Sequence, residues 1–97
     1  MEDYWEEIKL QKERAKVKTK EIIDSLDLPK DNTYIWYIRR VGMEGTAGGS
    51  YGSSKSGLRS SLRGWIDGVS EWNKFELSIK ICPLDNFTEV FRGSAEA

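Results

Sequence analysis

This chain of 97 residues has no histidine, a single cysteine and no long apolar run. The lone Cys82 excludes an internal disulfide, and the lack of histidine excludes Cys/His zinc sites, Ser-His-Asp triads and Cys-His pairs. No apolar stretch approaches the roughly 18 residues of a membrane span or the core of a secretion signal. We therefore expect a cytoplasmic protein without membrane contact, in which any catalysis uses Tyr, Arg, Lys, Ser, Asp or Glu.

Charged residues are abundant but nearly balanced, with a net charge of −1. The balance hides alternating blocks: −4 over 1–8, +5 over 9–20, −3 over 21–31, +4 over 32–63 and −3 over 64–97. The two basic blocks suit a phosphate backbone, although such blocks are also common on solvated faces that pair with their neighbours.

The first 28 residues are predicted to form a charged helix, because apolar residues recur every three or four positions over 3–26 and Pro29 follows. Lys12 and Thr19 fall on the same stripe as Trp5 and Ile22, so the middle of this helix is polar. We therefore expect the helix to pack by its two ends.

Residues 33–92 are predicted to form a small α+β domain. Alternating or β-branched residues indicate a central strand over 33–41, a short strand near 50–53 and a strand over 75–82. The Gly/Ser-rich segment 42–57 is expected to be a mobile loop.

Helices complete the predicted domain. An apolar stripe from Leu58 to Trp72 predicts a central amphipathic helix. Gly64 and Gly68 within it suggest either an interruption of the helix near Gly68 or close packing on another backbone, as a dimer contact or a helix–sheet contact. Asp85 is expected to cap a short C-terminal helix with Phe87, Val90 and Phe91 inward, followed by a frayed tail over 93–97. The expected fold is thus α+β, with a mainly antiparallel sheet of two to three strands.

The order of these elements resembles the GIY-YIG nuclease family over residues 33–91. The matching segments are Tyr34-Ile-Trp-Tyr-Ile, then Tyr51-Gly-Ser-Ser-Lys-Ser-Gly-Leu-Arg-Ser-Ser-Leu-Arg-Gly-Trp, then Phe75-Glu-Leu-Ser-Ile-Lys-Ile. The family has two tyrosine-bearing strands, a helix with a catalytic arginine and a later helix with a metal-binding glutamate.

By position, the resemblance assigns the first tyrosine to Tyr37 or Tyr34, the second to Tyr51, and the Mg²⁺ ligand to Glu89. The arginine position falls on Ser61, so Arg59 or Arg63 would have to replace it. The resemblance therefore implies a degenerate domain that binds without cutting, with no cofactor. An active, Mg²⁺-dependent nuclease would use Tyr37, Tyr51, Arg59 and Arg63.

Basic residues near these aromatics form the candidate nucleic-acid-binding set: Arg39, Arg40, Tyr51, Lys55, Arg59 and Arg63. Cationic side chains bind phosphate and aromatic side chains stack on bases. Our first hypothesis is a non-catalytic domain that binds nucleic acid through the Gly/Ser loop and the basic helix. The second is an inhibitor or adaptor, of the kind that phages and mobile elements encode, which binds one cellular protein.

Overall fold

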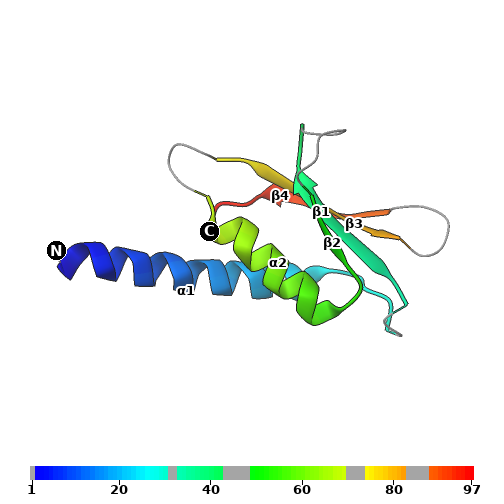
Figure 1. Cartoon of the computed structure of the whole chain (residues 1–97), viewed down its shortest axis with the longest axis horizontal. Helices are drawn as coiled ribbons and strands as arrows, with labels where there is room; N and C mark the ends of the chain where they lie inside the picture. Colours follow the sequence, from blue (N-terminus) through cyan, green and yellow to red (C-terminus); the bar gives the residue numbers. More distant parts are fainter. Residues whose placement is uncertain (1, 31–32, 43–48, 70–73, 83–87) are drawn as a thin grey trace.

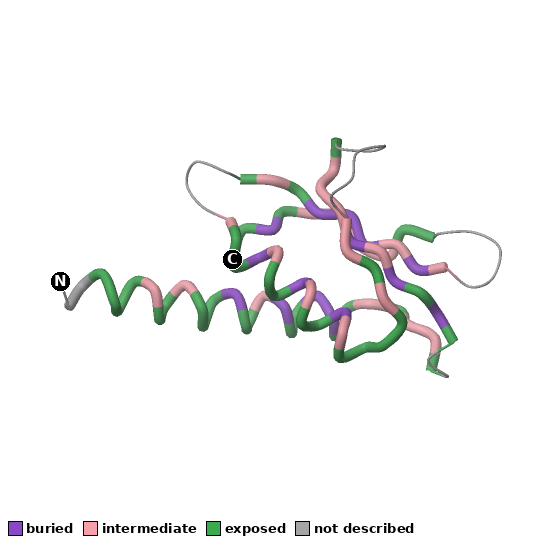
Figure 2. Tube along the Cα trace, viewed as in Figure 1, coloured by how far each residue is buried: buried purple, intermediate pink, exposed green. Residues whose placement is uncertain are grey.

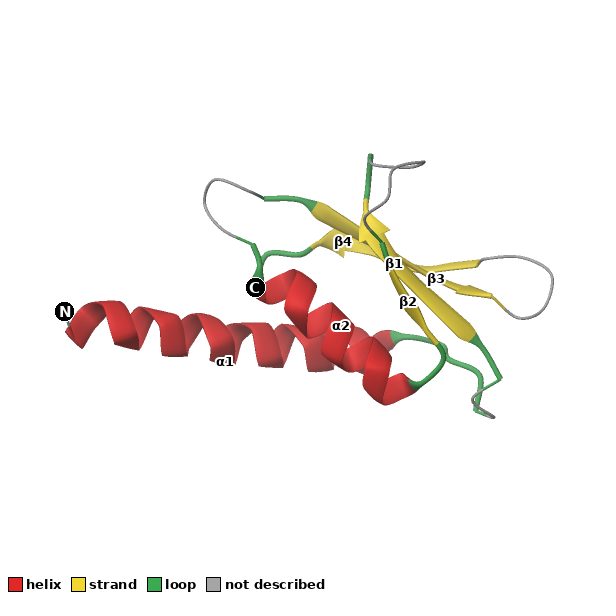
Figure 3. Cartoon of the chain, in the orientation of Figure 1, coloured by secondary structure: helices red, strands yellow, loops and turns green. Residues whose placement is uncertain are grey.

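The computed structural model describes residues 2–30, 33–42, 49–69, 74–82 and 88–97. Two helices and four strands follow one another as α1 (Glu2–Ser25), β1 (Ile35–Arg40), β2 (Ser50–Gly52), α2 (Lys55–Asp67), β3 (Glu76–Cys82) and β4 (Thr88–Ser94). The strands form one antiparallel sheet in the order β2-β1-β3-β4. Both helices lie on one side of this sheet (Figures 1 and 3). The α+β prediction is confirmed.

The core lies between the sheet and the helices. Side chains on one face of the sheet, such as Trp36, Ile38 and Ile79, are buried with the predicted stripe Leu58, Leu62 and Ile66 of α2. The Trp36 Nε1–H donates to the Ser54 carbonyl oxygen at 2.9 Å, just before α2 begins. This bond ties the central strand to the start of the helix.

Helix α2 begins at its N-cap Ser54, whose hydroxyl accepts the Gly57 N–H at 3.0 Å. It ends at the C-cap Gly68, so the predicted interruption near Gly68 is confirmed. A Cβ at Gly64 would meet no atom within 4 Å, so a helix–sheet contact at Gly64 is wrong, whereas a dimer contact there stays a prediction. Trp72, at the end of the predicted stripe, lies outside the described residues.

Helix α1 packs by its C-terminal half alone, so the prediction that both ends pack is wrong. Ala15, Thr19, Ile22 and Ile23 are buried, whereas Trp5 is 65% exposed (Figure 2). Thr19 is accommodated in the apolar contact because its hydroxyl donates to the Ala15 carbonyl oxygen at 2.6 Å. The buried half of α1 therefore belongs to the same core as the rest of the fold.

The predicted C-terminal helix is wrong, because Thr88–Ser94 is the strand β4 and the sheet has four strands rather than two or three. Glu89 lies opposite Lys80 and Phe91 lies opposite Ile79, which leaves Val90 as the extra residue of a β-bulge. The bulge breaks the two-residue alternation of a strand, so Val90 and Phe91 imitate a helical spacing. Asp85 and Phe87 lie outside the described residues.

The predicted frayed tail is also wrong over its first residues. Gly93 and Ser94 belong to β4, and Ala95 is fully buried with its N–H donating to the Phe75 carbonyl oxygen at 3.0 Å. Residues 43–48 of the predicted mobile loop lie outside the described residues, and its remainder contains β2 and the start of α2.

Candidate nucleic-acid interface

The predicted basic set divides between different surfaces. Arg39 and Arg40 are successive residues of β1, so their side chains leave opposite faces of the sheet. The Arg39 guanidinium lies 5.6 Å from the Tyr37 ring centroid, on the face away from the helices. Its neighbour Arg40 lies 4.7 Å from the ring centroid of Phe75, on the helix side. The two arginines therefore cannot serve one binding surface.

Arg40 lines a shallow cavity of about 410 Å³ together with Ser61 and Trp65. The Trp65 ring is edge-on to Phe75 with centroids 6.0 Å apart, and its Nε1–H donates to the Ser50 hydroxyl at 3.2 Å. Ser61 holds the position where the resemblance expects an arginine. Arg40, which comes from a strand, thus lines the same cavity as Ser61.

Arg59 and Arg63 line a second cleft, of about 210 Å³, between α1 and α2. Two lysines of α1, Lys16 and Lys20, line the same cleft, together with the carboxylate of Asp24. Four cationic side chains against one carboxylate make this cleft strongly basic. Arg59 and Arg63 are exposed, as are both lysines.

The helical period explains why these four side chains meet. Arg59 and Arg63 each follow a buried leucine of α2, and lie one turn apart. In the same way, Lys16 follows the buried Ala15 of α1 and Lys20 follows the buried Thr19, so these two lysines also lie one turn apart. Since the buried stripes pack the two helices together, the flanking cations line the cleft between them.

The other predicted contacts lie elsewhere. Lys55 is the first residue of α2 and is exposed, but it does not line the cleft. Tyr51 is 75% exposed on the edge strand β2, directly opposite Tyr37 of β1. Tyr34, the alternative to Tyr37, is buried, and this burial raises the pKa of its phenol. Tyr37 is therefore the tyrosine that shares a face with Tyr51.

The four residues of the nuclease hypothesis do not come together. Tyr37 and Tyr51 lie on the sheet face away from the helices, whereas Arg59 and Arg63 lie in the cleft between the helices on the other side. An arginine that neutralises charge at a phosphate must contact the same phosphate as the base. This placement separates those two roles by the full thickness of the sheet.

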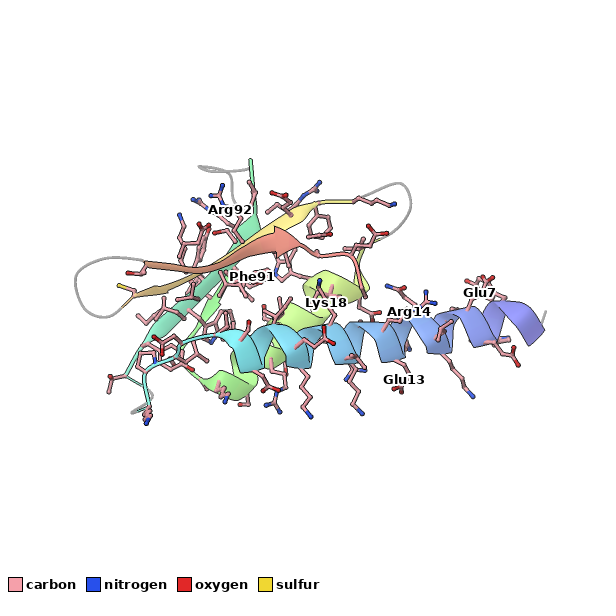
Figure 4. All side chains as sticks on the ribbon, turned by 180° about the vertical axis from the view of Figure 1, so that it is seen from behind. Glu7, Glu13, Arg14, Lys18, Phe91 and Arg92 are labelled. Carbon is pink, nitrogen blue, oxygen red and sulfur yellow. The ribbon has the colours of Figure 1, made fainter. Side chains whose placement is uncertain are left out.

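Glu89 lies on β4 rather than on a helix, where it accepts two hydrogen bonds. The Ser78 hydroxyl donates to Glu89 Oε1 at 2.5 Å, and Arg92 Nε–H donates to the same oxygen at 3.0 Å. These bonds, the one from Ser78 first, lower the pKa of the Glu89 carboxyl, and the positive charges of Arg92 and Lys80 lower it further. Figure 4 shows Arg92 on the side of the sheet that faces away from the helices.

This environment does not fit the Mg²⁺ ion that the resemblance implies. A hard cation needs several oxygen ligands, and Glu89 is a single carboxylate flanked by two cationic side chains. Within the described ranges, no group of three or more Cys, Asp or Glu residues is placed to hold a metal ion. The surroundings of Glu89 therefore do not fit the metal-binding role that the resemblance implies.

Sequence reasoning missed Lys16 and Lys20 as site residues. Their signal was the basic block over 9–20, which was recognised as a patch but was not connected with the block over 32–63. In the structure, Lys16 and Lys20 of the first block line the same cleft as Arg59 and Arg63 of the second block, because α1 packs along α2.

Comparison with known proteins gives no relative: no family model, no curated protein and no solved structure matches this chain. No helix of the described residues is both long and apolar enough to span a membrane. Among the surfaces described above, the basic cleft between α1 and α2 brings the largest number of the predicted cationic residues together with further cations.

Proposed function

We propose that this protein is a non-catalytic nucleic-acid-binding domain that holds the phosphate backbone in the basic cleft between α1 and α2. The observation behind the proposal is the meeting of Lys16 and Lys20 with Arg59 and Arg63 around a single carboxylate, Asp24. Arginine and lysine side chains bind phosphate oxygens through charge-assisted hydrogen bonds. Exposed cations along a groove follow a backbone without reading its sequence.

Binding without cleavage is supported by the placement of the residues that the resemblance nominates. The tyrosines and the arginines lie on opposite sides of the sheet, and Glu89 is paired with Arg92 instead of standing free for a metal. A backbone-binding cleft needs neither a general base nor a metal ligand, so this arrangement is compatible with binding alone.

The test is the binding of fluorescein-labelled 20-mer duplexes and single strands, measured by polarisation between 50 and 200 mM salt. Each phosphate contact contributes roughly −0.9 to the slope of log K against log salt for a duplex, and about −0.7 for a single strand. Four contacts give a slope near −3.6, so duplex affinity should fall roughly 100-fold over this fourfold range of salt. Undetectable binding of every probe at 50 mM salt would reject the proposal.

Matched lysine variants locate the surface. Replacing Lys16 and Lys20 with Gln should weaken binding at 50 mM salt and halve the salt slope, because two of four phosphate contacts are lost. The control replaces Lys9 and Lys30 with Gln, which removes the same charge from exposed positions outside the cleft. Equal loss of affinity in both variants would mean that net charge, and not the cleft, governs binding.

A further inference from the structure

The apolar stripe of α1 continues beyond the part of the helix that α2 covers. Tyr4 and Ile8 lie at the three- and four-residue spacings that lead to Ala15 and Ile22 on the buried face. Tyr4 is 64% exposed and Trp5 is 65% exposed, and their rings meet edge to face with centroids 6.0 Å apart. Figures 1 and 2 show this half of α1 extending past the rest of the molecule. Two adjacent aromatic side chains on a projecting helix mark an interaction surface.

A groove of about 810 Å³ runs between this half of α1 and the opposite wall, where α2 ends and the chain terminates. Ile8 and Val69 are among its apolar lining residues. Its charged lining residues are evenly divided, with three acids and three bases: Glu7, Asp67, Glu96, Lys12, Arg14 and Lys74. A polyanion would meet the three acids, so the groove does not suit nucleic acid. A partner with the same even distribution of charge suits it better.

We propose that the occupant is a second copy of this chain, whose α1 packs antiparallel along the first. Residues 1–8 carry −4 and residues 9–20 carry +5, so an antiparallel pair places each acidic end beside the basic segment of the other copy. Glu7 and Arg14 lie on the same side of α1 (Figure 4), and both line the groove. With the two-fold axis between residues 8 and 12, Glu7 of each copy meets Arg14 of the other.

The exposed area fits a weak dimer. Tyr4 and Leu10 both line the groove, and 64% of Tyr4 and 50% of Leu10 remain exposed. At roughly 150–250 Å² for each whole side chain, these four side chains of a dimer would cover roughly 350–550 Å², with a comparable area on the facing walls. The total, near 1,000 Å², is at the low end of specific interfaces. We expect a dissociation constant of roughly 10–100 μM.

Sedimentation equilibrium of the whole chain between about 5 and 500 μM tests the proposal. The average mass should rise from the monomer value of 11.1 kDa toward twice that value. Tyr4→Ala should weaken dimerisation at least about 100-fold, because Tyr4 lines the groove and is lost twice per dimer. Val17→Ala is the control: Val17 is also an exposed apolar residue of α1, at 54%, but it does not line the groove. At concentrations at which the parent and both variants are monomeric, all three proteins should have the same thermal unfolding midpoint.

Charge reversal distinguishes a second copy from any other partner. Glu7→Arg alone and Arg14→Glu alone should each weaken the dimer about tenfold, since each places like charges together twice. An equimolar mixture of these two variants should dimerise at least as well as the parent, because every Glu7–Arg14 contact then joins opposite charges. Glu13→Arg, on the opposite side of α1, should have little effect. A monomer at every concentration, or no recovery in the mixture, would overturn the proposal.

Discussion

Replacing Gly52 with Ala should test how tightly the central tryptophan is fixed. A Cβ at Gly52 would lie 2.5 Å from Cζ2 of Trp36, a distance that side-chain atoms do not adopt. Trp36 cannot move away easily, because it is buried and its Nε1–H donates to the Ser54 carbonyl oxygen. Overpacking of this kind costs about 1–3 kcal/mol, and loss of the hydrogen bond would cost a further ~0.5–1.5 kcal/mol. We therefore expect Gly52→Ala to reduce the free energy of unfolding by about 2–3 kcal/mol.

A double-mutant cycle with Trp36→Phe isolates this contact. Phenylalanine lacks the part of the indole ring that contains Cζ2, so Gly52→Ala should be far less harmful in the Trp36→Phe background. Urea unfolding of the four proteins should give an interaction free energy of about 1–2 kcal/mol. Additive effects within ~0.5 kcal/mol would refute the reasoning, because they would show that the added methyl group does not meet the indole.

Three further substitutions test separate features. Gly64→Ala should raise the free energy of unfolding by about 0.5–1 kcal/mol, since the helix has room for the methyl group; a lower melting temperature would contradict this. Ser54→Ala should lower it by about 0.5–2 kcal/mol, because the Gly57 N–H loses its acceptor; chemical denaturation measures the loss, and an unchanged midpoint would contradict the cap. Ser78→Ala should raise the pKa of Glu89 toward its ordinary value of 4.5, which carboxyl NMR titration detects. The folded-state pKa of Glu89 is lowered, so its contribution to stability is present above about pH 4.5 and is lost as the pH falls through the folded-state value. Ser78→Ala should make the free energy of unfolding depend less steeply on pH in acid. An equally steep dependence in the parent and the variant would contradict the role of the Ser78 hydroxyl.

The sequence correctly predicted the elements in which buried residues recur at a regular spacing. The stripe Leu58, Leu62 and Ile66 keeps its helical spacing, and β3 keeps its alternation between Leu77, Ile79 and Ile81, so both were predicted correctly. Strand β4 was missed because the bulge at Val90 interrupts the alternation. The register of that bulge is set by pairing with β3, which is a tertiary contact that local spacing does not record.

The candidate site was predicted only in part, for a similar reason. The sequence shows that Arg59 and Arg63 share a helix face, and that the block over 9–20 is basic. It does not show that Lys16 and Lys20 flank a buried contact, because the neighbouring Thr19 is polar and its spacing alone does not predict burial. In the structure Thr19 is buried, with its hydroxyl donating to the Ala15 carbonyl oxygen. The contact between the helices therefore had to come from the structure.

The strand order β2-β1-β3-β4 also bears on how the chain folds. Strands β1 and β2 pair with a near neighbour in sequence, and so do β3 and β4, which makes the sheet two local hairpins. Their junction pairs Ile38 with Ile79, which are 41 positions apart. Closing a loop of that length costs about 3 kcal/mol beyond a constant, and such non-local pairing slows folding. We therefore expect each hairpin to form on its own in microseconds, and the joining of β1 to β3 to limit the folding rate.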